Sequence, residues 1–308
     1  MMIIVLLYAL LASTFSLGKI ILHYTQPFFL VGIRMTLAGI ILLAYYSLFE
    51  KNKVIFEARL LWLYVQAILF IIYIPYTLRY WGLQHVTSSQ AAFLYNFGPF
   101  ISYIIACTMY KEEVSWQKIG GLVIGFAGLL VLLLSNNAIA FSSECYCISI
   151  PHIAILCSIT SLSYGWVIMS QLLKDHQHPP VLINGISMLG GGLLGLTTAY
   201  FCEQTRSPIT EYRPFLVLLI IIIIISNLIC HNLYASLLKR YTPTMLACAS
   251  FLSPCFTALY GWLFLKEPLS LHFFIAITAV LLGVLTFYLQ EIRIIFKKRN
   301  SLITEKHS

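Results

Sequence analysis

Two stretches of the sequence decide the fold: GPFISYIIACTMYKEEVS at residues 98–115 and SPCFTALYGWLFLKEPLS at residues 253–270. At one constant offset of 155 residues, without a gap, the second stretch repeats the landmarks of the first: Pro99 and Pro254, Lys111 and Lys266, Glu112 and Glu267, Ser115 and Ser270. Earlier in each half, Pro27 and Gly32 correspond to Pro180 and Gly185 at an offset of 153. This agreement predicts an internal repeat, which determines how the rest of the chain is interpreted.

The composition places the chain in lipid. Of its 308 residues, 60% are hydrophobic and 10% are charged, whereas about 25% of a soluble globular domain is charged. The mean hydropathy is +0.88. One soluble core would not bury so many apolar residues. A soluble enzyme, a disordered protein and a secreted disulfide scaffold are therefore excluded.

Ten segments are long enough to cross a membrane, since each crossing of the roughly 30 Å hydrocarbon layer needs about 20 apolar residues. They are Met2–Leu22, Phe28–Leu48, Leu60–Trp81, Val86–Met109, Gln117–Ser135, Ile150–Leu173, Val181–Cys202, Pro214–Leu237, Pro243–Leu265 and Leu271–Gln290. We predict an all-α membrane protein with ten transmembrane helices. Residues 1–137 hold the first five, residues 148–291 hold the second five, and residues 292–308 form a basic cytoplasmic tail. The first span lacks a basic leader and a cleavage site, so we expect it to be retained.

The basic residues predict the orientation. Thirteen Lys and Arg residues lie in one set of loops and the tail, and three lie in the opposite loops. Because cytoplasmic loops are enriched in these residues, both termini are predicted to be cytoplasmic. This bias also accounts for the net charge of +8, so no nucleic-acid partner is expected. Five helices per repeat turn the second copy upside down, and such inverted repeats are typical of secondary transporters, with the substrate site between the halves.

These features together resemble the EamA branch of the drug/metabolite transporter superfamily. The resemblance covers nearly all of residues 1–291 and rests on the two proline-bearing helices, the two Lys-Glu loops and the Gly-rich spans at 120–128 and 275–283. It implies two inverted five-helix EamA repeats in a bacterial inner membrane. They would move a small organic metabolite by alternating access, and no cofactor is implied.

The resemblance leaves the substrate open, because members carry amino acids, nucleotide-sugar-like compounds, cofactors, purines and drugs. Some members of obligate intracellular bacteria import S-adenosylmethionine in exchange for S-adenosylhomocysteine. The Ile-, Tyr- and Cys-rich composition is similar to that of such host-dependent bacteria, so this exchange is the favoured expectation. An aromatic or neutral amino-acid transporter, or a drug or metabolite exporter, is the alternative.

All 11 acidic residues lie in predicted loops, at span ends or in the tail. Proton relays and cation sites in transporters usually use an embedded carboxylate. We therefore predict exchange or facilitated diffusion, without a bound metal. His85 and His231 are the histidines placed to carry a proton.

Embedded basic residues suggest an anionic group on the substrate. Arg34 lies near the middle of the second span, where a buried arginine costs roughly 2.5–3.5 kcal/mol. A substrate carboxylate or phosphate, held by both arms of the guanidinium, would offset this cost. A structural arginine bonded to helix C-terminal carbonyls is the alternative. Lys19 is either a second carboxylate ligand or a residue that extends to the headgroups. Arg79, near the outer end of the third span, has the same two alternatives, a role in the site or a role at the membrane boundary.

Polar and aromatic side chains share helix faces in five spans. Asn227, His231 and Tyr234 follow the i, i+4, i+7 spacing of one face. Either these faces line a watery cavity, or they hydrogen-bond to other helices. We predict a cavity whose ligands are Lys19, Arg34, Tyr76, Asn96, Tyr164, Asn227, His231 and Tyr234. Its aromatic faces would suit a planar base or a cation.

A membrane enzyme and a channel are two further classes of embedded protein. A membrane enzyme needs clustered acid, base or metal residues, and a channel more often shows a pore loop or subunit symmetry. The sequence has no P-loop, dinucleotide fingerprint, nucleophile elbow or zincin motif, so an enzyme is not predicted. A disulfide among Cys145, Cys147 and Cys202, on the predicted external side, is left open.

Overall fold

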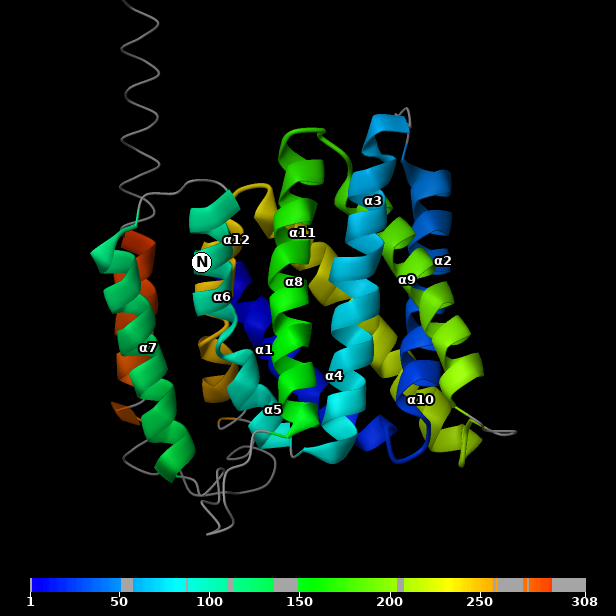
Figure 1. The fold of residues 1–308 in the computed structure, drawn as a ribbon, viewed down its shortest axis with the longest axis horizontal. Helices are drawn as coiled ribbons and strands as arrows, with labels where there is room; N and C mark the ends of the chain where they lie inside the picture. Colours follow the sequence, from blue (N-terminus) through cyan, green and yellow to red (C-terminus); the bar gives the residue numbers. More distant parts are fainter. Residues whose placement is uncertain are drawn as a thin grey trace, which may run out of the picture.

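The computed structural model of the chain describes residues 2–50, 58–86, 88–109, 114–135, 149–203, 208–256, 259, 274–275 and 277–289. In this part of the chain the regular elements are all helices, and one isolated β-bridge joins Thr25 to Ile209. Figure 1 shows the helices standing side by side, with α7 (Trp116–Ser135) at one edge and α2 (Pro27–Phe49) and α9 (Pro180–Cys202) near the other. The predicted all-helical architecture is confirmed.

Six helical rods are long and apolar enough to cross a membrane. They are α1 (Met2–Ile21), α2, the continuous rod of α3 (Leu61–Ala67), η2 (Ile68–Tyr73) and α4 (Ile74–His85), then α8 (Ile150–Lys174), α9, and the rod of α10 (Tyr212–Ile222), η3 (Ile223–Cys230) and α11 (His231–Leu238). Four shorter apolar helical stretches, Phe93–Met109, Trp116–Leu130, Pro243–Phe256 and Ile277–Leu289, overlap the other four predicted spans. Every predicted span therefore contains helix, and six of them reach crossing length among the described residues.

The fourth predicted span is divided into two helices. It consists of α5 (Ser88–Tyr95) and α6 (Gly98–Met109), separated by a turn at Asn96 and Phe97. Pro99 explains the break, because proline has no N–H for a helical bond and its ring clashes with the carbonyl four residues earlier, that of Tyr95. The tight turn at this break places Asn96 between two helix ends.

The second repeat has a comparable break. Its helix α12 (Pro243–Ala249) ends before a turn at Ser250 and Phe251, and helix resumes at Leu252. Pro254 lies four residues after Ser250, as Pro99 lies four residues after Tyr95. The equivalent prolines therefore interrupt equivalent helices of the two halves.

The inverted relation of the halves is visible where α2 packs against α9. A Cβ atom on Gly32 would lie 2.6 Å from the backbone N of Leu196, and one on Gly185 would lie 2.9 Å from the side chain of Leu43. Gly32 corresponds to Gly185, and Leu43 corresponds to Leu196, each at an offset of 153 residues. The two contacts are thus one contact repeated by a pseudo-twofold axis, as inverted repeats require.

Two lysines mark the same symmetry at the two ends of the bundle. Lys19, near the end of α1, donates from Nζ to the carbonyl of Val86 at 2.9 Å. Lys174, at the end of α8, donates from Nζ to the carbonyl of Tyr241 at 3.0 Å. The two lysines are 155 residues apart, and the two residues whose carbonyls accept these bonds are also 155 residues apart. Each lysine therefore ties the first helix of its repeat to the segment that follows the third.

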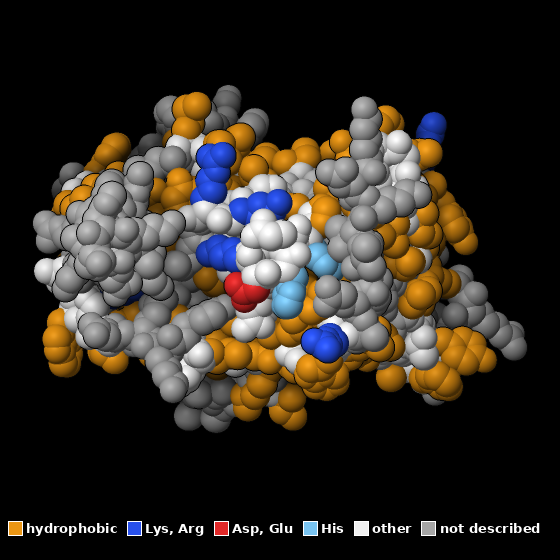
Figure 2. Space-filling model, turned by 90° about the horizontal axis from the view of Figure 1, so that it is seen from above, with side chains coloured by type: hydrophobic (Ala, Val, Ile, Leu, Met, Phe, Trp, Pro, Cys, Tyr) orange, Lys and Arg blue, Asp and Glu red, His pale blue; other side chains and the backbone are white. Residues whose placement is uncertain are grey.

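One end of the bundle is basic. Viewed from above in Figure 2, Lys and Arg side chains gather on the end where α8 finishes. Lys174, Lys239 and Arg240, which lie at the ends of α8 and α11, belong to loops that the sequence predicts to be cytoplasmic.

Candidate substrate-binding site

A cavity of about 310 Å³ lies between the two halves. It is lined from α1, α4, the α5–α6 break, α8, the η3–α11 rod and α12, so both repeats contribute to its walls. The volume is in the range of small-molecule sites. Of the predicted ligands, the cavity lining includes Tyr76, Asn96, His231 and Tyr234.

Tyr76 and His231 join the halves at the cavity wall. The two residues are 155 positions apart, and the hydroxyl of Tyr76 lies 2.5 Å from Nε2 of His231. They follow the π-helical segments η2 and η3, which themselves begin 155 residues apart. Such segments occur frequently at functional sites. The Nδ1 atom of His231 is buried without a hydrogen-bond partner, so a polar ring atom remains for a ligand.

Aromatic rings continue from this point, with Tyr80 outside the cavity lining and the other rings in the wall. Tyr76 stacks on Tyr80 with centroids 6.4 Å apart, and His231 lies 5.5 Å from Trp166. Trp166 stacks on Tyr234 at 4.1 Å with an interplanar angle of 26°. We call these five residues the aromatic ladder. Flat faces of this kind bind planar bases by stacking and cations through the ring quadrupole.

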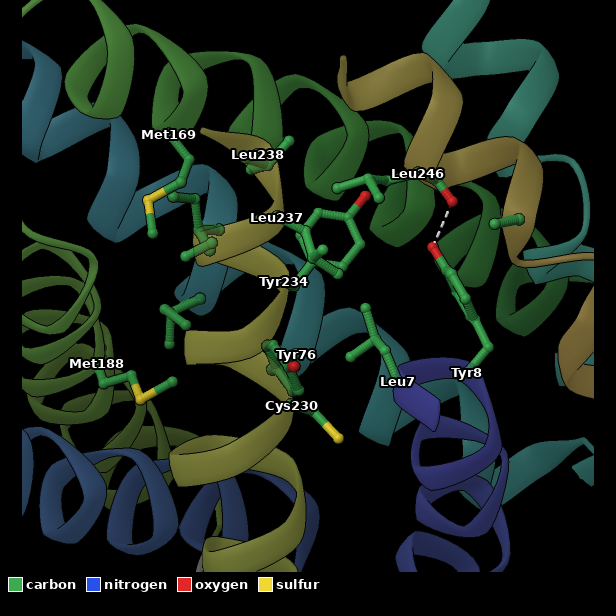
Figure 3. Close-up of a cluster of buried hydrophobic side chains, with 14 of the residues drawn as sticks. Leu7, Tyr8, Tyr76, Met169, Met188, Cys230, Tyr234, Leu237, Leu238 and Leu246 are labelled. Carbon is green, nitrogen blue, oxygen red and sulfur yellow. Dashed lines mark hydrogen bonds between the residues drawn. The ribbon is translucent and has the colours of Figure 1, made fainter. Parts of the chain in front are cut away.

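The ladder ends near a contact between α1 and α12. Figure 3 shows Tyr8 reaching from α1 toward the carbonyl of Leu246, with Tyr234 beside them. The Tyr8 hydroxyl donates to that carbonyl. Tyr8 is 3% exposed and also lines the cavity, so this contact between α1 and α12 lies at the cavity wall.

Arg79, which the sequence places near the outer end of the third span, lies in the cavity wall. Its guanidinium carbon is 5.1 Å from the ring centroid of Tyr95 and 5.8 Å from that of Tyr80. The sequence contained a signal for this placement, because Arg79 follows Tyr76 by three residues and so shares its helix face.

Arg34 has a different setting. It is 1% exposed and lies outside the cavity lining, behind Tyr76. Its guanidinium donates to Asn227 Oδ1 at 2.7 Å, to the Tyr80 hydroxyl at 2.5 Å and to Ser226 Oγ at 2.9 Å. Side chains, not the helix carbonyls of our alternative, therefore hold the charge. Asn227, another predicted ligand, is likewise buried behind the wall.

Two predicted ligands lie away from the cavity lining. Tyr164 donates from its hydroxyl to Gln66 Oε1 at 2.6 Å, which is the interhelical hydrogen bond of our alternative interpretation. Lys19 bonds to the carbonyls of Leu83 and Val86 at 2.5 and 2.9 Å, so it engages the end of α4 instead of extending to headgroups.

The cavity has a positive character. Arg79 lies in its wall and Arg34 behind it, and no acidic residue belongs to the described lining. Glu203, at the end of α9, instead accepts from the backbone N–H groups of Phe28 and Phe29 at 2.6 and 2.8 Å and so caps α2. Such an environment favours a ligand with a negative group.

Neither a metal cluster nor a disulfide is found in the described part of the chain. No group of three or more His, Cys, Asp or Glu residues there could hold a metal ion. Cys202 is a free thiol, and Cys145 and Cys147 lie outside the described residues.

Two inverted helical repeats around a polar and aromatic cavity are typical of secondary transporters. The sequence profile of the EamA-like transporter family matches residues 1–134 and 149–289. The chain belongs to this family, within the drug/metabolite transporter superfamily, and is a multi-pass membrane transporter, not an enzyme.

Sequence similarity to named transporters extends over almost the whole chain. An S-adenosylmethionine/S-adenosylhomocysteine transporter of Chlamydia muridarum is 30% identical over 92% of this chain and 89% of its own length. The transporter of the same description from Chlamydia trachomatis serovar L2 is 29% identical over 92% of this chain and 86% of its own length. One crystal structure of a protein superposes with a TM-score of 0.70 at 16% identity, covering 95% of this chain and 96% of the other, which shows a shared fold.

Proposed function

We propose that the protein takes up S-adenosylmethionine in exchange for S-adenosylhomocysteine across a bacterial inner membrane, with both termini in the cytoplasm. The observation that carries the proposal is the composition of the cavity wall, which has a cation at Arg79 and a ladder of aromatic rings beyond it. The named Chlamydia relatives support the same substrates.

Both substrates have the parts that such a wall recognises. Each has an adenine, which stacks on aromatic faces, and an amino-acid head whose carboxylate suits an arginine. The sulfonium of S-adenosylmethionine adds a cation that binds over aromatic rings. The two molecules differ by one methyl group and one positive charge. A site built on their shared parts therefore binds either molecule in turn.

Exchange follows from this shared recognition. The halves rock about the pseudo-twofold axis, so the cavity opens to each side alternately. If the return step is fast only with a substrate bound, each inward movement of S-adenosylmethionine is matched by one outward movement of S-adenosylhomocysteine. The described acidic residues lie at helix ends, which supports a cycle without a carboxylate-borne proton.

Counterflow in proteoliposomes tests the proposal. We expect S-adenosylhomocysteine inside the vesicles to accelerate uptake of labelled S-adenosylmethionine many times over empty vesicles, with no loss when a protonophore is added. Unlabelled adenosine compounds with an amino-acid head should compete, and tyrosine and tryptophan should not. Uptake that collapses with the protonophore and gains nothing from preloading would contradict exchange. If tyrosine alone competed for uptake, the substrate would be an aromatic amino acid and not S-adenosylmethionine.

A further inference from the structure

We infer that Arg79 and Asn96 form the carboxylate subsite of the cavity, in place of the Arg34 site suggested by the sequence. The inference rests on the proposed function only in requiring a ligand with an amino-acid head. Arg79 comes from α4 and Asn96 from the α5–α6 break, and both line the cavity.

Asn96 provides the first observation. Its side chain is 4% exposed, and its Nδ2 atom is buried without a hydrogen-bond partner. A buried donor that lacks an acceptor loses its hydration without compensation. A ligand oxygen in the cavity restores the missing hydrogen bond, so this amide indicates an acceptor on the ligand.

Arg79 provides a positive charge in the same cavity wall, so the ligand group that accepts from Asn96 is expected to be an anion. Its guanidinium is held against the faces of Tyr95 and Tyr80, so its position is fixed before a ligand arrives. A planar guanidinium suits a two-oxygen carboxylate. No acidic residue in the described lining competes for it.

Arg34 is poorly placed for the same task. Three protein side chains accept its hydrogen bonds, and the ring of Tyr76 lies 5.2 Å from its guanidinium carbon. A ligand would have to displace at least one of these partners, which are themselves buried. Arg34 therefore adds positive potential from behind the wall, while Arg79 makes the contact.

The symmetry of the fold separates the subsite from the aromatic end. Arg79 and Tyr234 are 155 residues apart and occupy equivalent positions in the two repeats. An axis in the membrane plane inverts their depths. The carboxylate is thus held at one end of the cavity, which leaves the Trp166 and Tyr234 stack at the other for the adenine.

The test compares S-adenosylhomocysteine with its decarboxylated analogue in the full-length purified protein. In Arg79→Gln we expect the affinity for S-adenosylhomocysteine to fall about 10- to 100-fold, as for loss of a charged hydrogen bond. The affinity for the decarboxylated analogue should change by less than about threefold. Arg213→Gln, an exposed arginine at the start of α10, is the matched control and should bind both ligands as the wild type does.

Asn96→Ala gives a second, independent reading, because it removes the amide without touching the charge. It should also lower affinity for S-adenosylhomocysteine more than for the analogue. Equal losses for both ligands, or no loss, in Arg79→Gln would overturn the assignment. If Arg79→Gln does not fold, an unchanged ligand ratio in Asn96→Ala would overturn it.

Failure of the proposed substrates is distinguishable from failure of this subsite. If the wild-type protein binds no adenosine compound but binds an aromatic amino acid, the same variants are compared with tyrosine and tyramine. A preference for tyrosine that is lost in Arg79→Gln would support the subsite, and a preserved preference would overturn it.

Discussion

Replacing Gly192 by valine is expected to prevent α9 from packing against α2. A Cβ atom at Gly192 would lie 2.4 Å from the backbone N and 2.5 Å from the Oγ1 of Thr36. The close neighbour is backbone, so relief requires one helix to move away from the other. Overpacking typically costs about 1–3 kcal/mol, and we expect Gly192→Val to exceed this range because a whole helix must shift.

The measurement is the yield and melting temperature of the purified protein in detergent. Gly120→Val is the matched control, since a Cβ atom at Gly120 meets nothing within 4 Å. The control should retain the wild-type yield and melting temperature. A folded Gly192→Val protein as stable as Gly120→Val would contradict the close α2–α9 contact on which the inverted arrangement depends.

Replacing Arg34 by alanine is expected to destabilise the protein before any ligand is added. The change removes three hydrogen bonds and leaves Asn227, Ser226 and Tyr80 without this donor in a buried place. Hydrogen bonds to charged groups contribute about 1.5–3 kcal/mol each, although their losses do not add fully. We therefore expect a loss of at least about 3 kcal/mol.

Arg34→Lys should not restore the stability, because one ammonium group does not reproduce the planar fork that reaches three separate partners. The measurement is the melting temperature without ligand, with Arg79→Gln as the comparison, which we expect to be less affected. Wild-type stability in Arg34→Ala, combined with lost affinity for carboxylate ligands, would mean that Arg34 binds the substrate directly.

Repeats and helices were predictable because they depend on local patterns. Apolar length identifies a span, and a constant offset between Pro99 and Pro254 identifies a repeat wherever the helices lie in space. The break at Asn96 is also a local effect of Pro99, but the sequence alone did not show whether the proline would bend the helix or end it.

The residues that bind the substrate in the cavity were harder to predict, because the cost of embedding a charged side chain does not reveal which group offsets that cost. Arg34 was a candidate for binding the substrate because some group must offset the cost of burying its charge, yet Asn227 and Ser226, almost 200 residues later, supply acceptors for it. Arg79 looked peripheral because it lies near the end of its span. Only the packing of α4 against the α5–α6 break brings it to the cavity wall.

The most direct measurement of the central claim is substrate protection of a cysteine placed in the cavity. In a variant without native cysteines, Ser250→Cys puts a thiol in the lining, and Ser236→Cys puts one on the exposed face of α11 as a control. We expect S-adenosylmethionine and S-adenosylhomocysteine each to slow alkylation at position 250 by a membrane-permeant maleimide and to leave position 236 unaffected. Alkylation at position 250 that proceeds at the same rate with both ligands at saturation would contradict the account.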